Sequence, residues 1–511
     1  MTGSACQNVS LSRSWTTRVG IFFIFILIPV IVAPQFLDYA QEAKTTSLVI
    51  GISFLLFAFS ARIDEFMGAL GKLRSLPRLF WFSLLGLLLS SFVSLRGSSD
   101  LLVSYHALRN LIFPILAAML TSVFLCRHAV LTHLSLSSTL IACLGLCQIA
   151  FNIKYLTPMS DSGQFPGVTF GNRGLATTFV ALGFIPTLSM LRTRTGNIKY
   201  VLAAGIFFQG SFLFAAMTRS SILACVLATW IWQRLDSRGR GTPHQESTQS
   251  QTRHLVKPML LCASLLACVV VCVYANSTLR ILLEQRLNIR TWLANPRLEL
   301  WSSCLKGFAS ADIWSQSFGF GPGQFLPQSE PWLVGTSLAG RVFADAHNDY
   351  LQILVEYGAL GLLFHLLMIS VCLSKISSAS TQDETRFIYL GNAVLILLAA
   401  CFFYPFNIPF LSFLFWIMLL TPLVSPASET SLEKYSKVWS KGSRRFIQLA
   451  LISLSLMLAN EAWNRMLLEA NMRAYLYGRD SSIQKMVTRK ALLKQMRTIP
   501  VPFLYRKFVK K

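Results

Sequence analysis

Residues 351–372 have the sequence LQILVEYGALGLLFHLLMISVC, in which Glu356 is the one formally charged residue. A helix needs roughly 20 apolar residues to cross about 30 Å of hydrocarbon, so this stretch is long enough to span a bilayer. Similar runs recur along almost the whole chain of 511 residues, of which 53% are hydrophobic and 13% charged. Because a soluble protein of this size is far less apolar, the sequence predicts an all-α polytopic membrane protein.

Eleven further apolar runs bring the prediction to about twelve transmembrane helices. They lie near residues 19–34, 47–60, 79–95, 109–126, 129–151, 174–191, 200–216, 221–232, 258–275, 389–403 and 409–424. The first of them resembles the core of a signal peptide, but no small-residue cleavage site follows it, so we expect a retained helix.

The C-terminal region allows two topologies. Residues 446–460 are apolar but short, and form either a thirteenth span or a helix lying in the membrane interface. We predict a transmembrane domain over residues 1–460 and a basic tail over 461–511. The positive-inside rule favours a cytoplasmic tail, whereas a thirteenth span would place the tail outside.

The net charge of +24 would suggest nucleic-acid binding in a soluble protein. Here the Lys and Arg residues lie mainly in short segments between apolar runs, such as 61–78, 192–199 and 233–257. Cytoplasmic loops of membrane proteins carry this excess, so we predict membrane lipids and no nucleic acid as partners. With the N-terminus in the cytoplasm, segments 152–173 and 276–350 face the other side.

Segment 276–350 is the longest polar stretch in the chain, and a loop of that length is usually functional. We expect short amphipathic helices within it. The chain has no GxxxxGK[ST] loop and no Asp-x-Asp pair, which argues against a nucleotide-sugar donor. A sugar transferase of this kind needs a lipid-activated donor, cations for its diphosphate and a base for the acceptor hydroxyl.

His347 is the candidate base, in the sequence Asp345-Ala-His-Asn-Asp-Tyr-Leu-Gln352, where the long loop enters an apolar helix. An ordinary imidazole pKa near 6.5 leaves neutral nitrogen available to accept a proton, and Asp345 or Asp349 would orient the ring. The alternative is an interfacial polar cluster in which Asn348 or Asp349 caps the helix.

Three arginines are candidate ligands for a diphosphate. Arg219 lies in MTRSS (217–221), Arg173 in FGNRG (170–174) and Arg297 in RLELW (297–301). A guanidinium binds phosphate oxygens through two parallel charge-assisted hydrogen bonds. The alternative for each is an arginine that extends its charge to the membrane surface.

The chain resembles the O-antigen ligases and the related O-antigen and exopolysaccharide polymerases over about residues 167–364. The ligase pattern of His, then Asn, Ser or Gln, nine residues, Gly, two residues and a small or aromatic residue is complete here. It falls on His347, Asn348, Gly358 and Gly361. Further landmarks in the expected order are Thr218-Arg-Ser, Arg297 with Trp301, and the glycine run at 319–325, which by itself would indicate only a sharp turn or a close backbone approach.

The resemblance implies a metal-independent GT-C-like glycosyltransferase without a cofactor, in the bacterial inner membrane with its active site facing the periplasm. The implied donor is an undecaprenyl-diphosphate-linked glycan, and the implied acceptor is a lipid A core sugar or another glycan. His347 would be catalytic, while Arg219, Arg173, Arg297 and Asn348 would bind the diphosphate or sugar. A Wzy-type polymerase and, from another class, a flippase or transporter of lipid-linked oligosaccharides remain alternatives.

Overall fold

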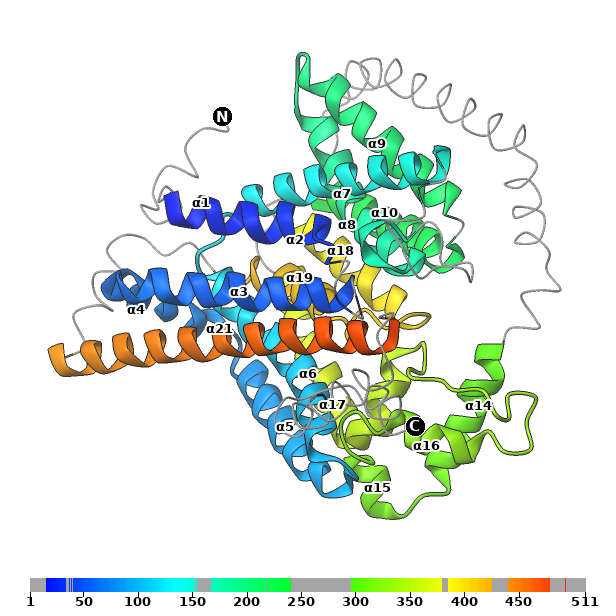
Figure 1. The fold of residues 1–511 in the computed structure, drawn as a ribbon. Coiled ribbons are helices and arrows are strands. Elements are labelled where there is room, and N and C mark those ends of the chain that lie inside the picture. The colour runs from blue at the N-terminus through cyan, green and yellow to red at the C-terminus, as the bar shows by residue number, and fades with distance from the viewer. Residues whose placement is uncertain are drawn as a thin grey trace.

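The computed structural model describes residues 15–33, 36, 38, 40–151, 153, 167–216, 218–239, 296–378, 385–424, 440–477 and 492. Every regular element in this part of the chain is a helix (Figure 1). They are α1 (Trp15–Phe22), η2 (Phe23–Leu27), α2 (Ile28–Val30), α3 (Gln41–Ser60), α4 (Ile63–Leu70), η3 (Gly71–Ser75), α5 (Arg78–Ser94), η4 (Leu95–Gly97), α6 (Leu101–Ser122), α7 (Arg127–Ala150), η6 (Val168–Phe170), α8 (Arg173–Thr193), α9 (Ile198–Ala215), α10 (Arg219–Gly239), α14 (Pro296–Ala309), α15 (Ile313–Phe318), α16 (Phe325–Trp332), α17 (Asp349–Ser378), α18 (Thr385–Ala400), α19 (Pro409–Leu420) and α21 (Lys441–Tyr477).

Eight helices of the described residues are long and apolar enough to cross a membrane. Three shorter apolar helices accompany them, Val19–Val30, Thr385–Ala400 and Pro409–Leu420. These helices confirm the prediction of an all-α polytopic membrane protein. The span expected at 258–275 lies outside the described residues.

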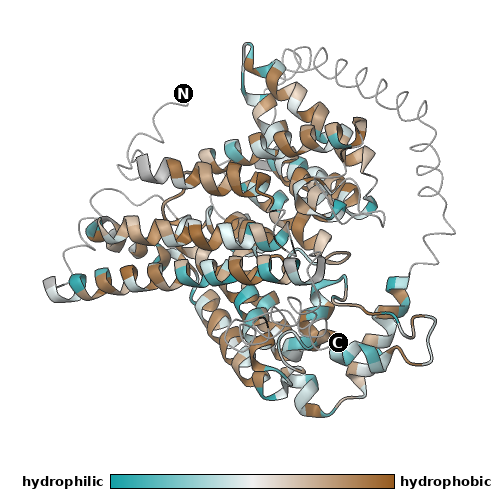
Figure 2. Ribbon diagram, viewed as in Figure 1, coloured by the Kyte–Doolittle hydropathy of each residue, from teal (hydrophilic) through white to brown (hydrophobic). Residues whose placement is uncertain are grey.

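Side chains on the outer surface of the bundle are apolar, as the buried ones are. A helix of a soluble protein would carry polar side chains on its outer surface. On α5, Phe80 and Leu87 are buried, yet Phe92 on the outward side is 71% exposed. Figure 2 shows hydrophobic residues on all sides of several helices. Such surfaces are stable in hydrocarbon, so the burial pattern agrees with a membrane-embedded bundle.

The expected start of one span was wrong. The sequence prediction begins the fourth helix at residue 109, whereas α6 begins at Leu101, two turns earlier. The carboxylate of Asp100 accepts hydrogen bonds from the backbone N–H groups of Leu102 and Val103 and caps this helix. The polar residues of its first turns, which apolar counting leaves out, are paired with another helix.

That partner is α21, which lies along the whole of α3 (Figure 1). Ser455 Oγ donates to the carbonyl of Ser53 at 2.9 Å, and Arg444 pairs with Asp64 at 2.5 Å near one end. Contacts near the other end join later residues of α21 to earlier ones of α3, so the two helices are antiparallel. The length of α21 favours the thirteenth span over an interfacial helix, and the helix continues past residue 460.

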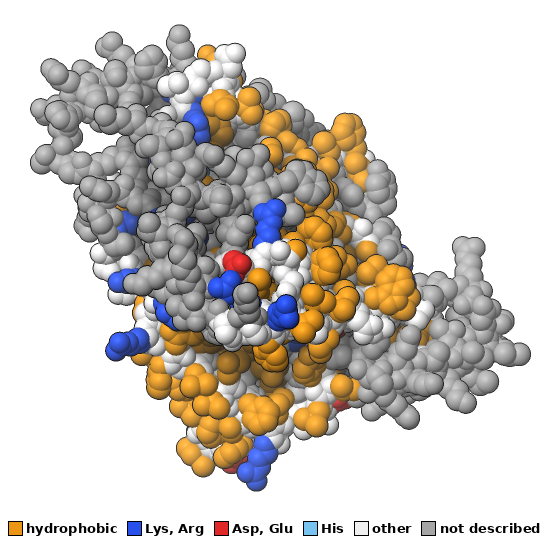
Figure 3. Space-filling model, turned by 90° about the vertical axis from the view of Figure 1, so that its left-hand side faces the viewer, with side chains coloured by type: hydrophobic (Ala, Val, Ile, Leu, Met, Phe, Trp, Pro, Cys, Tyr) orange, Lys and Arg blue, Asp and Glu red, His pale blue; other side chains and the backbone are white. Residues whose placement is uncertain are grey.

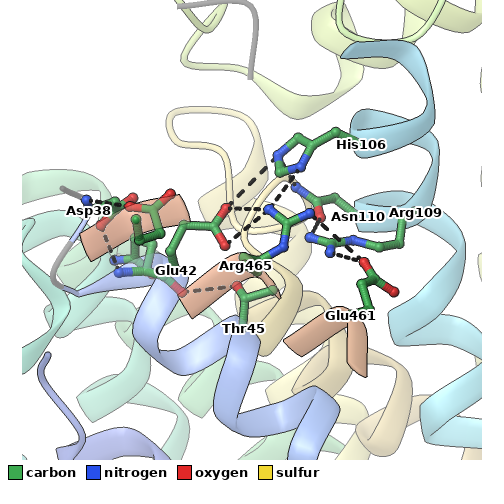
Figure 4. A network of polar contacts seen from close by, with 10 residues as sticks. Asp38, Glu42, Thr45, His106, Arg109, Asn110, Glu461 and Arg465 are labelled. Carbon is green, nitrogen blue, oxygen red and sulfur yellow. Dashed lines mark hydrogen bonds and ion pairs between the residues drawn. The ribbon is translucent and has the colours of Figure 1, made fainter. Parts of the chain in front are cut away.

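Buried charges join α21 to α3 and α6 (Figure 4). Arg465 Nη1 lies 3.4 Å from the carboxylate of Glu42 and 3.2 Å from Nδ1 of His106. Arg109 Nη1 donates to Glu461 at 2.6 Å. Ionic groups at membrane depth are stable when they are paired, so these contacts fix α21 in register against the bundle.

Positively charged side chains lie at one end of the bundle. Figure 3 faces the end at which α21 begins, and shows Lys and Arg side chains with few acidic ones. The positive-inside rule predicts this composition for a cytoplasmic end. We call the opposite end, where α17 begins, the site end.

At the site end the short helices α14 and α16 form a second hydrophobic cluster with the first turns of α17. Leu300 and Cys304 of α14, Phe325 of α16 and Val355 of α17 are buried in it. The long polar segment therefore contains short helices, as expected.

Candidate functional site

His347 lies in the turn that leads from this cluster into α17. Its backbone has a φ of +52°, a left-handed conformation that residues other than glycine rarely adopt. Asn348 Oδ1 accepts a hydrogen bond from the N–H of Leu351 at 3.1 Å, so this side chain caps the helix. An unusual φ of this kind persists only where neighbouring contacts enforce it.

The peptide group before His347 is held from two sides. The N–H of Ala346 donates to Oε1 of Gln352 at 2.8 Å, and its carbonyl accepts from the indole Nε1 of Trp301 at 2.8 Å. Gln352 Nε2 in turn donates to the buried carboxylate of Glu356 at 2.6 Å. These bonds fix the direction in which the His347 side chain leaves the backbone.

The loop between α18 and α19 covers the turn. The rings of His347 and Tyr404 have centroids 5.4 Å apart. Asn407 Nδ2 donates to Asp345 at 2.7 Å, and the N–H of Phe406 donates to Asp349 at 2.7 Å. Among the described residues neither carboxylate forms a hydrogen bond with the imidazole, so the expectation that one of them orients the ring is wrong.

Tyr404 and Asn407 did not appear among the residues singled out in the sequence. The available signal was the segment Tyr404-Pro-Phe-Asn407, which breaks an otherwise apolar stretch between two short spans on the same side as His347. Only the fold shows that this segment touches the turn.

Burial sets the protonation of the two titratable groups in the turn. It lowers the pKa of His347 to about 4, with a further contribution from the positive charge of Arg297. It raises the pKa of Asp345 to about 6, opposed by the hydrogen bond from Asn407. His347 is therefore neutral at physiological pH, and its Nδ1 is buried with no hydrogen-bond partner among the described residues.

These pKa values predict an unusual pH profile for a reaction that uses neutral His347. We expect kcat/KM, which reports groups of the free enzyme, to stay flat from about pH 8 down to about pH 5 rather than to fall near 6.5. The measurement is the initial rate across this range at limiting donor concentration. A fall near pH 6 that persists in Asp345→Asn would contradict the prediction, whereas one that disappears in that variant belongs to the carboxyl group.

Two of the predicted arginines border the loop that carries Tyr404. Arg297 Nη1 donates to the carbonyl of Phe402 at 2.8 Å, and its guanidinium lies 5.3 Å from the ring centre of Phe403. Arg173 is the first residue of α8, directly after Asn172, whose Nδ2 donates to the Tyr404 hydroxyl at 3.4 Å. Arg173 and Arg297 thus approach the same loop from different helices.

Arg219 reaches this region through its neighbours. It is the first residue of α10, and Ser221 in the same turn accepts a hydrogen bond from Thr177 of α8 at 2.9 Å. Because Thr177 lies one turn after Arg173, the N-terminal turns of α8 and α10 meet at the site end. Helix N-termini carry partial positive charge, which adds to that of the two guanidinium groups.

The glycine run passes directly over a break in α17. Gly358 has non-helical angles within the helix, with φ +72° and ψ −178°. The N–H groups of Phe320 and Gly321 donate to the carbonyls of Val355 and Glu356 at 2.9 and 3.1 Å. The glycines therefore serve a close backbone approach that shapes the entry to α17.

Residues 201–366 match the family described as O-antigen ligase. This match confirms the resemblance stated from the sequence motifs, and it includes Arg219, Arg297 and His347 but not Arg173. No curated protein matches the chain. The match supports a role in the assembly of O-antigen or a related polysaccharide by a multi-pass membrane protein with ligase-like glycosyltransferase character.

Proposed function

We propose that this chain is a metal-independent O-antigen ligase, which transfers a glycan from undecaprenyl diphosphate to a sugar of the lipid A core. The observation that carries the proposal is a neutral, half-buried imidazole at the end of the membrane bundle where three arginines also lie. The O-antigen ligase match over most of this region supports it.

In the proposed reaction His347 accepts the proton of an acceptor hydroxyl while that oxygen attacks the anomeric carbon. The bond from this carbon to the diphosphate breaks, and the electron pair leaves with the phosphate oxygen. Arg219, Arg173 and Arg297 stabilise the negative charge that develops there, and Asn348 holds the turn. Attack from the face opposite to the leaving group inverts the configuration.

The pKa of His347 fits this sequence of events. Part of its lowering comes from Arg297, whose positive charge a bound diphosphate would offset. Donor binding should therefore raise the pKa of His347 toward values at which an imidazole is an effective base. His347 would be a weak base in the absence of the donor and a stronger base when the donor is bound.

Reconstitution tests the function and separates it from the polymerase. The purified chain in proteoliposomes, with a chelator and an undecaprenyl-diphosphate-linked glycan, should form product when rough lipopolysaccharide is supplied as the acceptor. Product that forms only by joining two lipid-linked glycans would identify a polymerase. Movement of the glycan lipid between leaflets without new product would identify a flippase.

Replacing Arg219 by Lys tests the need for a guanidinium. We expect a roughly tenfold or larger loss of kcat/KM, because an ammonium group cannot form two parallel bonds to a phosphate. Arg194→Lys is the matched control, because Arg194 is exposed at the opposite end of α8. Equal activity in both variants would show that Arg219 only extends its charge to the membrane surface and does not bind the diphosphate.

A further inference from the structure

The turn before Arg173 has a strained backbone. Val168 has a φ of +48°, and besides His347 it is the only residue other than glycine with a positive φ in the described part of the chain. A β-branched residue in this conformation is a true outlier, because its side chain crowds the backbone. His347 contacts Tyr404 directly, and Val168 lies four residues before Asn172, which also contacts Tyr404, so strain is concentrated on two sides of the candidate site.

A buried lysine of α3 holds this turn. Lys44 has no exposed surface, and its Nζ donates to the carbonyls of Thr169 and Ile31 at 2.7 Å each. The same Nζ lies 4.7 Å from the ring centre of Phe170. On its other side the turn receives a bond from Gln148, whose Oε1 accepts the N–H of Val168 at 2.9 Å.

The N-terminus of α3 supplies a second bond, and α21 fixes that N-terminus. Gln41 Nε2 donates to the carbonyl of Phe170. Asp38 Oδ1 accepts the N–H of Gln41 at 2.9 Å, and the N–H of Asp38 donates to Glu469 of α21 at 3.1 Å. Figure 4 shows that this end of α3 continues into the ionic contacts between α3, α6 and α21.

We propose that Lys44 is a positioning residue for the donor site: with Gln41 it holds the 168–171 turn in its strained form, and so fixes where Asn172 and Arg173 meet Tyr404. α21 stabilises this arrangement through the bond between Glu469 and Asp38, and it lies outside the region matched to the family. The inference rests on the proposed function, since its readout is transfer. A buried lysine at membrane depth is rare and usually functional, and one of the two backbone carbonyls that Lys44 binds belongs to this turn.

The first test replaces Lys44 by Met, which keeps the length of the side chain and removes its donors. We expect kcat/KM for the lipid-linked donor to fall roughly tenfold, mostly through a higher KM, because a misplaced Arg173 weakens donor binding. Lys72→Met is the matched control: Lys72 Nζ also donates to a backbone carbonyl, that of Val123 at 3.0 Å, but in the segment between α4 and α5. That control should keep its activity within about twofold.

The second test combines substitutions. If Lys44 acts through the turn, Lys44→Met should cost little more in an Arg173→Ala background, so the two losses should not add. General destabilisation would reduce activity by the same factor in both backgrounds, and would overturn the proposal. Gln41→Leu should reproduce the higher KM if Lys44→Met fails to fold, and an unchanged KM in that variant would also overturn it. An inactive wild type would instead refute the proposed function.

Discussion

His347→Ala is expected to lower kcat/KM for glycan transfer by about 10²–10⁴, the usual contribution of a positioned general base. The imidazole lies against Tyr404, with Nδ1 free of hydrogen bonds among the described residues and a pKa that keeps it unprotonated. Alanine removes the proton acceptor and leaves the two hydrogen bonds that hold the Ala346 peptide in place. The measurement is the rate of transfer in proteoliposomes at limiting donor.

Two further variants separate chemistry from backbone strain. His347→Asn tolerates the left-handed φ better than alanine but provides no basic nitrogen, so it should be as inactive as His347→Ala. His128→Ala removes an exposed histidine at the first turn of α7, and should leave transfer unchanged. Near-normal transfer in His347→Asn would show that the turn matters and the imidazole does not.

The membrane fold followed from the sequence because hydropathy reports the solvent of each helix directly. The helix that became α17 was expected at residues 351–372 and runs from Asp349 to Ser378. Errors arose where polar residues enter a span: α6 begins eight residues before its expected start at 109, because His106 lies within a paired network. Apolar counting treats such residues as loop, since the pairing partner is hundreds of residues away.

The sequence predicted residues of the candidate site only where they belong to a local motif. His347, with its helix and glycine spacing, is a sequence-local feature, and so is the capping role of Asn348. Tyr404 and Lys44 depend on contacts between segments far apart in the chain, for which one sequence gives no signal. The same reason made Asp345 an expected partner of His347, although it bonds to Asn407 instead.

Strained backbone at both sides of Tyr404 adds a physical reason for the site. A left-handed His347 and a left-handed Val168 are each unfavourable alone, and each is enforced by buried polar contacts. Such conformations are retained where the direction of a side chain matters more than local stability. In the proposed reaction the first turn directs the base, His347. The second turn positions Arg173, which binds the diphosphate.

Gly358→Ala is expected to remove transfer almost completely, through the shape of the site. A Cβ at this position would lie 2.3 Å from the carbonyl oxygen of Ser317 and 2.5 Å from the backbone nitrogen of Gly319. Neither is a side chain that can move aside, so the loop must separate from the break in α17. That separation would weaken the two backbone hydrogen bonds to Val355 and Glu356, and the same helix face carries the Gln352–Glu356 bond that holds the Ala346 peptide.

The control for this prediction separates the steric clash from the cost of a positive φ. Gly335 has a φ of +82° and no heavy atom within 4 Å of an added Cβ, so Gly335→Ala meets the cost of a positive φ without the contact. That penalty alone is about 1–2 kcal/mol, which a folded domain tolerates. Gly335→Ala should therefore retain most of its transfer activity while Gly358→Ala does not. If the two variants lost activity equally, backbone strain rather than close approach would explain the glycine in the motif, and the contact between the loop and α17 would have no special role.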